Sequence, residues 1–249
     1  DDDGNSFRVE GSDLGKEAGK FTSLTGGFVG VENLTGGSGD DQFHFDPGAG
    51  LSESVDGAGG TDELFLQPYT SDLAYTLTGL GSVNGFAGST AGTPNPVGGT
   101  FDNINTITDD PLGSDTLVGH NAAADWLIGS ANTYTSNTQV LGFTGIENLT
   151  GGTGDDTFTL TETSTFGNVD GDIDGGLGSN TLVADDRANE WTIDGEGIGT
   201  LNNGLSGGFS GIENLVGGLN VDTFIFGLSG WVDGNVDGGG QFDELDLEA

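Results

Sequence analysis

A ten-residue pattern, Phe-x-Gly-Ile/Val-Glu-Asn-Leu-x-Gly-Gly, returns three times in this chain. It starts at Phe28, Phe143 and Phe209, and each copy continues into a Gly/Asp turn and a short apolar–polar alternation. The copies read FVGVENLTGGSGDDQFHF, FTGIENLTGGTGDDTFTL and FSGIENLVGGLNVDTFIF. A recurring pattern of this length is typical of stacked repeats, in which each layer contacts only its neighbours. The repeat therefore predicts a solenoid rather than a globule built around a single site.

A second marker, aromatic-x-aliphatic, fixes the phase of the repeat. It occurs at Phe7, Tyr75, Trp126 and Trp191, and each time a Glu-Asn-Leu segment or the degenerate copy at 101–107 follows. We expect Tyr75, Trp126 and Trp191 to lie in the core or to cap the stack. The Leu of Glu-Asn-Leu is expected in the core, with the Asn residues stacked in a hydrogen-bonded ladder. The two markers divide one continuous solenoid, 1–249, into four units, at approximately 1–68, 69–119, 120–184 and 185–249.

Within a unit the Gly-rich turns return every 21 to 24 residues, as from Gly36 to Gly57 and from Gly151 to Gly175. Short alternating strands with Gly/Asp/Asn corners suit one coil of a parallel β-helix. In the alternation of 157–160, Phe158 and Leu160 are expected inside. The predicted fold is all-β: a right-handed parallel β-helix (β-solenoid) of about 11 coils, spaced by ~4.8 Å. No helix is expected, because Gly, Asp, Asn and Thr dominate and no stretch keeps a 3.6-residue period.

The turns carry the chemistry. GGSGDDQFH at 36–44 and GGTGDDTFT at 151–159 fit the pattern Gly-Gly-x-Gly-x-Asp-x-apolar-x at every position. Five more turns fit it with one or two departures, at 57–65, 110–118, 175–183, 217–225 and 238–246. The pattern resembles the calcium-binding nonapeptide of the repeats-in-toxin family. Here the nonapeptides are not in tandem, so the resemblance does not imply that family's compact roll with two strands per turn and a full ion column.

The resemblance implies calcium ligands at the sixth position of each turn. These residues are Asp41, Asp62, Asp115, Asp156, Asn180, Asp222 and Asp243. Neighbouring acids are expected to add ligands, namely Asp40, Asp155, Asp174 and Asp237. Stacking also favours a cation, since equivalent carboxylates ~4.8 Å apart repel by roughly 3.5 kcal/mol at an effective dielectric near 20. Calcium accepts carboxylate and carbonyl oxygens in flexible geometry, and the alternative is that these aspartates only cap exposed corners.

The charge of the chain narrows the classes of partner. Its 40 acidic and 4 basic residues give a formal net charge of −36, which disfavours nucleic acid and anionic membranes as partners. An acidic disordered tail is the alternative, but 33% of the residues are hydrophobic and they recur regularly. No apolar run reaches the ~20 residues of a membrane span. The lack of methionine favours a processed or excised piece, and we expect a secreted, extracellular or cell-surface protein.

Three classes of function fit this pattern. The first is a non-catalytic, calcium-rigidified structural module of a bacterial adhesin, surface protein or extracellular filament. The alternatives are a polysaccharide-processing enzyme and a glycan- or ice-binding module with a flat Thr-rich face. We expect no catalysis, because the only basic residues are Arg8, Lys16, Lys20 and Arg187 and no unrepeated segment gathers unusual residues. The phasing also allows copies to stack head to tail into a filament.

Overall fold

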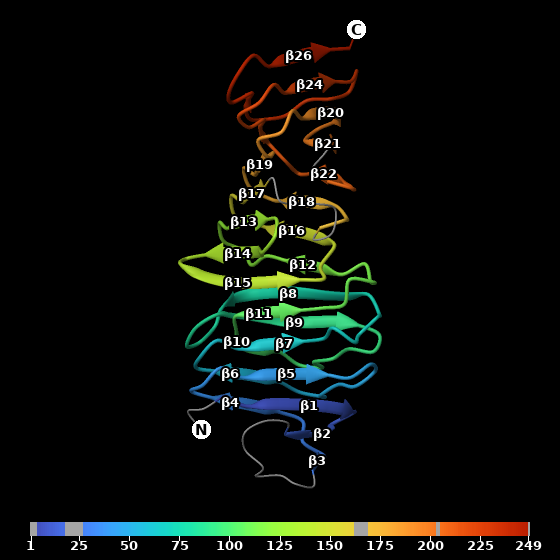
Figure 1. The fold of residues 1–249 in the computed structure, drawn as a ribbon, viewed down its shortest axis with the longest axis vertical. Helices are drawn as coiled ribbons and strands as arrows, with labels where there is room; N and C mark the ends of the chain where they lie inside the picture. The colour runs from blue at the N-terminus through green and yellow to red at the C-terminus, as the bar shows by residue number, and fades with distance from the viewer. Residues whose placement is uncertain (1–3, 18–26, 162–168, 203–204, 249) are drawn as a thin grey trace. The chain divides into compact units, whose positions relative to one another are not determined.

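The computed structural model describes residues 4–17, 27–161, 169–202 and 205–248, and the regular structure in these ranges is β-strand throughout (Figure 1). The all-β prediction is confirmed. The chain forms two compact units, one made of residues 1–118 and 138–146 and the other of residues 119–137 and 147–249. Each unit contains two sheets in which parallel strand pairs predominate.

The first unit contains a sheet that we call the β5 sheet, with the order β3-β2-β1-β5-β7-β11-β15. Its strands are β1 (Ser6–Gly11), β2 (Leu14–Glu17), β3 (Phe28–Val29), β5 (Gln42–Phe45), β7 (Glu63–Phe65), β11 (Thr106–Thr108) and β15 (Gln139–Thr144). The other is the β6 sheet, with the order β4-β6-β10-β9-β8-β12. Its strands are β4 (Leu34–Gly37), β6 (Val55–Ala58), β8 (Leu73–Leu80), β9 (Phe86–Gly92), β10 (Phe101–Ile104) and β12 (Thr116–Val118).

The second unit is built in the same way. Its β17 sheet has the order β14-β13-β17-β19-β23-β25. These strands are β13 (Asp125–Ile128), β14 (Asn132–Ser136), β17 (Thr157–Leu160), β19 (Thr181–Val183), β23 (Asn214–Val216) and β25 (Val236–Asp237). Its β18 sheet has the order β16-β18-β22-β21-β20-β24-β26. These strands are β16 (Asn148–Gly152), β18 (Ile173–Gly176), β20 (Glu190–Gly195), β21 (Ile198–Leu201), β22 (Gly208–Ser210), β24 (Thr223–Phe226) and β26 (Glu244–Leu247).

Within each unit the chain alternates between the two sheets. β4 belongs to the β6 sheet, and β5, β6 and β7 then fall in the β5, β6 and β5 sheets in turn. We call a stretch of 21 to 24 residues that gives one strand to each sheet a pass. Strands of successive passes pair in parallel register, as Phe43 does with Leu64 and Leu149 with Ile173. This is the two-strand arrangement that the spacing of the turns did not imply, and it is possible because the strands are short and the corners take the remaining residues.

The aromatic marker introduces antiparallel strands, which the sequence analysis did not predict. β1-β2-β3, β8-β9-β10 and β20-β21-β22 are antiparallel meanders, and β13-β14 is an antiparallel hairpin. The loops between β1 and β2 and between β20 and β21 have two residues, one of them at positive φ, Asp13 (50°) or Gly197 (58°), and they reverse the direction of the chain. Such turns match the twist of antiparallel hairpins. In each of these meanders the Phe of the Phe-x-Gly segment, or its counterpart Phe101, lies on the third strand.

The core consists of the inward-facing residues of these strands. Trp126, Trp191 and Tyr75 are fully buried, as predicted, and Phe158 and Leu160 are buried while Thr157 and Thr159 are partly exposed. Marker aromatics stack on the aromatic residue of the next pass. Ring centroids are 5.3 Å apart for Phe7 and Phe43, 5.3 Å for Trp126 and Phe158, and 5.4 Å for Trp191 and Phe224. The strands are therefore held in register by side-chain stacking as well as by backbone hydrogen bonds.

Candidate functional site

The sixth residue of each Gly/Asp turn is drawn into the protein. Each directly precedes a strand that follows its turn, and six of the seven are at most 2% exposed. The buried ones are Asp41, Asp62, Asp115, Asp156, Asn180 and Asp222. Asp243 occupies the same position in the last turn and is exposed. The predicted ligand positions are thus buried carboxylates, which is uncommon because a carboxylate loses its hydration when it is buried.

A side-chain oxygen of the sixth turn residue accepts a backbone hydrogen bond from the preceding pass. Asp41 N–H donates to Asp62 Oδ1 at 2.8 Å, and Asp222 N–H donates to Asp243 Oδ1 at 2.9 Å. Asp156 N–H donates in the same way to Asn180 Oδ1 at 3.0 Å. These side chains therefore form short ladders that join the turns, and an Asn can serve as a rung in place of an Asp.

The ladders also include residues that the sequence analysis did not select. Asp62 N–H donates to Asn105 Oδ1 at 3.0 Å, and Asn180 N–H donates to Glu213 Oε2 at 2.7 Å. Asn105 and Glu213 each lie one residue before a strand, as the turn acids do. This shared position was the signal that could have identified them.

The second carboxylate oxygen lies over the first glycine of the turn. A Cβ atom built on Gly217 would lie 2.5 Å from Asp222 Oδ2 and 2.6 Å from the Gly238 carbonyl oxygen of the next pass. Gly57 faces Asp62 Oδ2 and the Asn103 carbonyl in the same way. In turns that begin with this glycine, any side chain would displace both oxygens. The turn at 110–118 begins with Asp110 instead, and there Gly113 lies beside Asp115 Oδ2.

Several of these second oxygens lack a hydrogen-bond donor. For Asp41, Asp62 and Asp222, Oδ2 is buried and has no hydrogen-bond partner among the residues that the structure describes. Burial of an unsatisfied polar atom is costly. Each of these oxygens is therefore a candidate metal ligand, with peptide oxygens close by.

Burial affects the titration of these acids. Loss of hydration raises the pKa of Asp62 from 3.8 to about 6, and the carboxylates of Asp41, Asp40 and Asp56 add to the rise, while the hydrogen bond from Asp41 N–H opposes it. Burial likewise raises the pKa of Asp156 to about 6 and raises the pKa of Asp222. These sites therefore favour a neutralising partner, either a proton or a cation.

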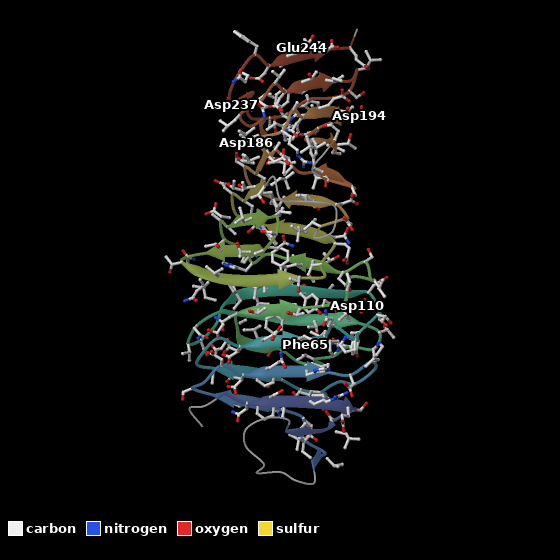
Figure 2. The ribbon with its side chains drawn as sticks, viewed as in Figure 1. Phe65, Asp110, Asp186, Asp194, Asp237 and Glu244 are labelled. Carbon is white, nitrogen blue, oxygen red and sulfur yellow. The ribbon has the colours of Figure 1, made fainter. Side chains whose placement is uncertain are left out.

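The additional acids predicted as ligands are exposed and accept backbone hydrogen bonds, two of them from the next pass and two within their own turns. Asp40 Oδ1 accepts the Thr61 N–H at 2.7 Å, and Asp155 Oδ1 accepts the Ser179 N–H at 2.8 Å. Asp174 and Asp237 each accept the N–H two residues ahead, at 3.0 and 2.9 Å, and Asp237 lies on the outside of the protein in Figure 2. No group of three or more His, Cys, Asp or Glu residues that could hold a metal ion occurs in the described part of the chain. A cation at a turn would therefore need peptide oxygens as ligands.

The Glu-Asn-Leu segments have a structural role that differs in part from the prediction. Their Leu residues, Leu34, Leu149 and Leu215, are buried as expected. Their Asn residues do not stack on one another. Instead Asn33, Asn148 and Asn214 each accept, through Oδ1, the backbone N–H of Ser54, Asp172 and Asn235 in the next pass, at 3.0 to 3.1 Å. Asn148 and Asn214 begin β16 and β23, and Asn33 directly precedes β4, so the repeat places the same link between passes at the start of each of these strands.

No protein-family model, no curated protein and no solved structure matches this chain. Among the residues that the structure describes, no helix has the length and apolar character needed to cross a membrane.

Proposed function

We propose that this chain is a right-handed parallel β-solenoid that serves as a non-catalytic structural module of a secreted bacterial surface protein, adhesin or filament, with calcium bound at its Gly/Asp turns. The alternation of short strands between two sheets, in parallel register from pass to pass, supports the solenoid. Most acids at the turns bond to backbone N–H groups, which suits a scaffold.

The observation that carries the calcium proposal is the buried carboxylate with one open oxygen. In Asp41, Asp62 and Asp222, one oxygen joins the ladder, and the other, which has no donor, lies beside the first glycine of its turn together with a peptide oxygen of a neighbouring pass. A carboxylate oxygen and a carbonyl oxygen beside the same glycine suit a hard cation that takes both kinds of ligand. Calcium would neutralise the buried charge and link successive turns. Asp41, Asp62, Asp156 and Asp222 would hold it, together with peptide oxygens of the turn glycines.

The proposal also accounts for the charge of the chain. A formal net charge of −36 destabilises a compact fold by self-repulsion, and divalent cations at fixed positions would offset it. Extracellular fluids provide the calcium that such sites require, which is why we place the protein outside the cell. Ligand binding to the folded state alone stabilises it, by about 2.7 kcal/mol for one site at a calcium concentration of 100 times Kd.

Calorimetric titration with calcium tests the role of the buried acids. Asp62→Asn should remove one binding event and leave the fold intact, because Asn180 already occupies the equivalent position and accepts the same backbone bond. Asp194→Asn removes the same charge from an exposed residue of the other unit and should leave the stoichiometry unchanged. Calcium heats that do not differ between the wild type and Asp62→Asn would contradict Asp62 as a ligand.

A further inference from the structure

The last pass of the second unit ends in an open sheet edge. β25 and β26 are the final strands of the β17 and β18 sheets, and β26 pairs only with β24 among the described strands (Figure 1). Leu245 on β26 has the inward phase of Phe224, but it is 55% exposed, and Leu247 is 67% exposed. The counterparts of Leu245 in internal turns, Leu64 and Leu182, are fully buried. This edge therefore lacks the layer that covers the equivalent strands elsewhere.

Inside each unit the same edge is covered by the next repeat. In the second unit, Ile173 of β18 pairs with Phe209 of β22, and Leu182 of β19 pairs with Leu215 of β23. The Asn180 N–H donates to the Glu213 carboxylate at 2.7 Å. The covering layer thus consists of a Phe-x-Gly strand and a Glu-Asn-Leu strand, one on each sheet.

The first unit repeats this junction with different residues. Val55 of β6 pairs with Phe101 of β10, and Leu64 of β7 pairs with Ile107 of β11. Asp62 N–H donates to Asn105 Oδ1 at 3.0 Å. Two independent junctions therefore follow one rule of register, and Val236 and Leu245 hold the corresponding positions on β25 and β26.

The matching layer exists at the opposite end of the chain's own repeats. β3, with Phe28, and β4, which follows Glu32 and Asn33, are the Phe-x-Gly and Glu-Asn-Leu strands of the first repeat. Each is the last strand of its sheet in the first unit. Glu32 and Asn33 are exposed, and no described residue donates a hydrogen bond to the Glu32 carboxylate. In the second unit the equivalent carboxylate, that of Glu213, binds the preceding turn.

From these junctions we infer that the β25–β26 edge docks the β3–β4 edge of a second copy of this chain, head to tail. The register of the internal junctions places Val236 against Phe28, Leu245 against Leu34, and Asp246 beside Thr35 of the second copy. Asp243 N–H would donate to Glu32 of that copy, as Asn180 does to Glu213. This inference rests on the stacked-strand part of the proposed function and does not require calcium.

Charge favours the head-to-tail arrangement over tail-to-tail pairing. The last pass carries Asp243, Glu244, Asp246 and Glu248, so two such edges facing each other would oppose like charges. The β3–β4 edge, by contrast, carries a single acid in residues 28–37, Glu32. It therefore opposes less negative charge to the β25–β26 edge than a second β25–β26 edge would.

Cysteine cross-linking tests the register, since the natural chain has no Cys. Thr35 and Asp246 are exposed, and paired positions on neighbouring strands lie ~4.8 Å apart, within the range of a disulfide. Mild oxidation of a mixture of Thr35→Cys and Asp246→Cys proteins should give a heterodimer that is scarce in either protein alone. Dimers of Asp246→Cys alone at the same yield would show tail-to-tail pairing and overturn the inference. Absence of any cross-link would overturn it too.

A second variant measures the apolar contact. Leu245→Asp should weaken self-association by about ten- to a hundredfold in sedimentation analysis, because it removes a buried Leu contact and adds a charge. Val83→Asp changes a residue that is 69% exposed in the first unit and should leave association unchanged. Both experiments are run in calcium and in EDTA. Cross-linking that persists without any calcium-dependent stability would refute only the calcium proposal, and calcium-dependent stability without cross-linking would refute only the interface.

Discussion

At the scale of single residues, the first glycine and the sixth residue of a turn depend on each other. The acid folds back over the glycine, so that one oxygen binds the preceding turn and the other lies where a Cβ would be. The resemblance of the nonapeptides selected seven turn positions, and the structure buries six of them. The resemblance could not show that the side chains themselves link the turns, because a hydrogen bond to the backbone of another pass imposes no particular spacing on the sequence.

The raised pKa of Asp62 gives a pH dependence with a definite sign. The folded state holds a proton up to a pKa of about 6, against 3.8 for the unfolded chain, so it binds more protons between these values. Stability from this group is therefore complete below about pH 4 and is lost as pH rises through 6. In EDTA, the melting temperature of the wild type should fall over this window, and that of Asp62→Asn should fall less.

Asp194→Asn is the matched control for this pH profile, since it removes one carboxylate from an exposed position and allows for the general self-repulsion of an acidic chain. Its profile should follow that of the wild type. Equal slopes for Asp62→Asn and the wild type between pH 4 and 6 would show that Asp62 does not take up a proton on folding.

At the scale of elements, the markers are the places where the chain leaves its parallel course. Aromatic-x-aliphatic segments begin meanders, and the aromatic side chain stacks on the next pass. The period of the turns and the alternation in strands such as 157–160 predicted the parallel pairs correctly. The sequence does not predict the antiparallel strands, because short loops with Gly and Asp suit the corners of a coil as well as hairpin turns. A residue at positive φ, such as Asp13, makes such a loop a hairpin turn.

The aromatic stack at the meander gives an element-scale prediction. Trp191 is fully buried between Phe209 and Phe224, at centroid distances of 5.9 and 5.4 Å. Trp191→Ala should lower the free energy of unfolding by about 3–5 kcal/mol, since it removes a large side chain from a packed site. Trp231→Ala, at a residue that is 45% exposed, should cost much less. Chemical denaturation followed by circular dichroism measures both, and equal losses would contradict the role of the stack.

At the scale of the whole molecule, the sequence repeat accounts for much of the strand pairing within each unit. Because each pass contacts only its neighbours, one rule of register recurs at the junctions of both units. The same locality explains why two strands per pass were not predicted, since the spacing of the turns does not report how a coil is divided between sheets. Leu245 and Leu247 are exposed because no described strand covers the outer edge of β26.

Thermal unfolding with and without calcium tests the central claim most directly. At pH 7.5 and fixed ionic strength, the melting temperature should rise with calcium until the sites are filled and fall back on addition of EDTA, because only the folded chain offers the paired oxygens. Magnesium at the same concentration should have a much smaller effect, since its rigid octahedral shell fits turn carbonyls poorly. An identical melting temperature in calcium, magnesium and EDTA would contradict the account that the buried turn carboxylates bind calcium.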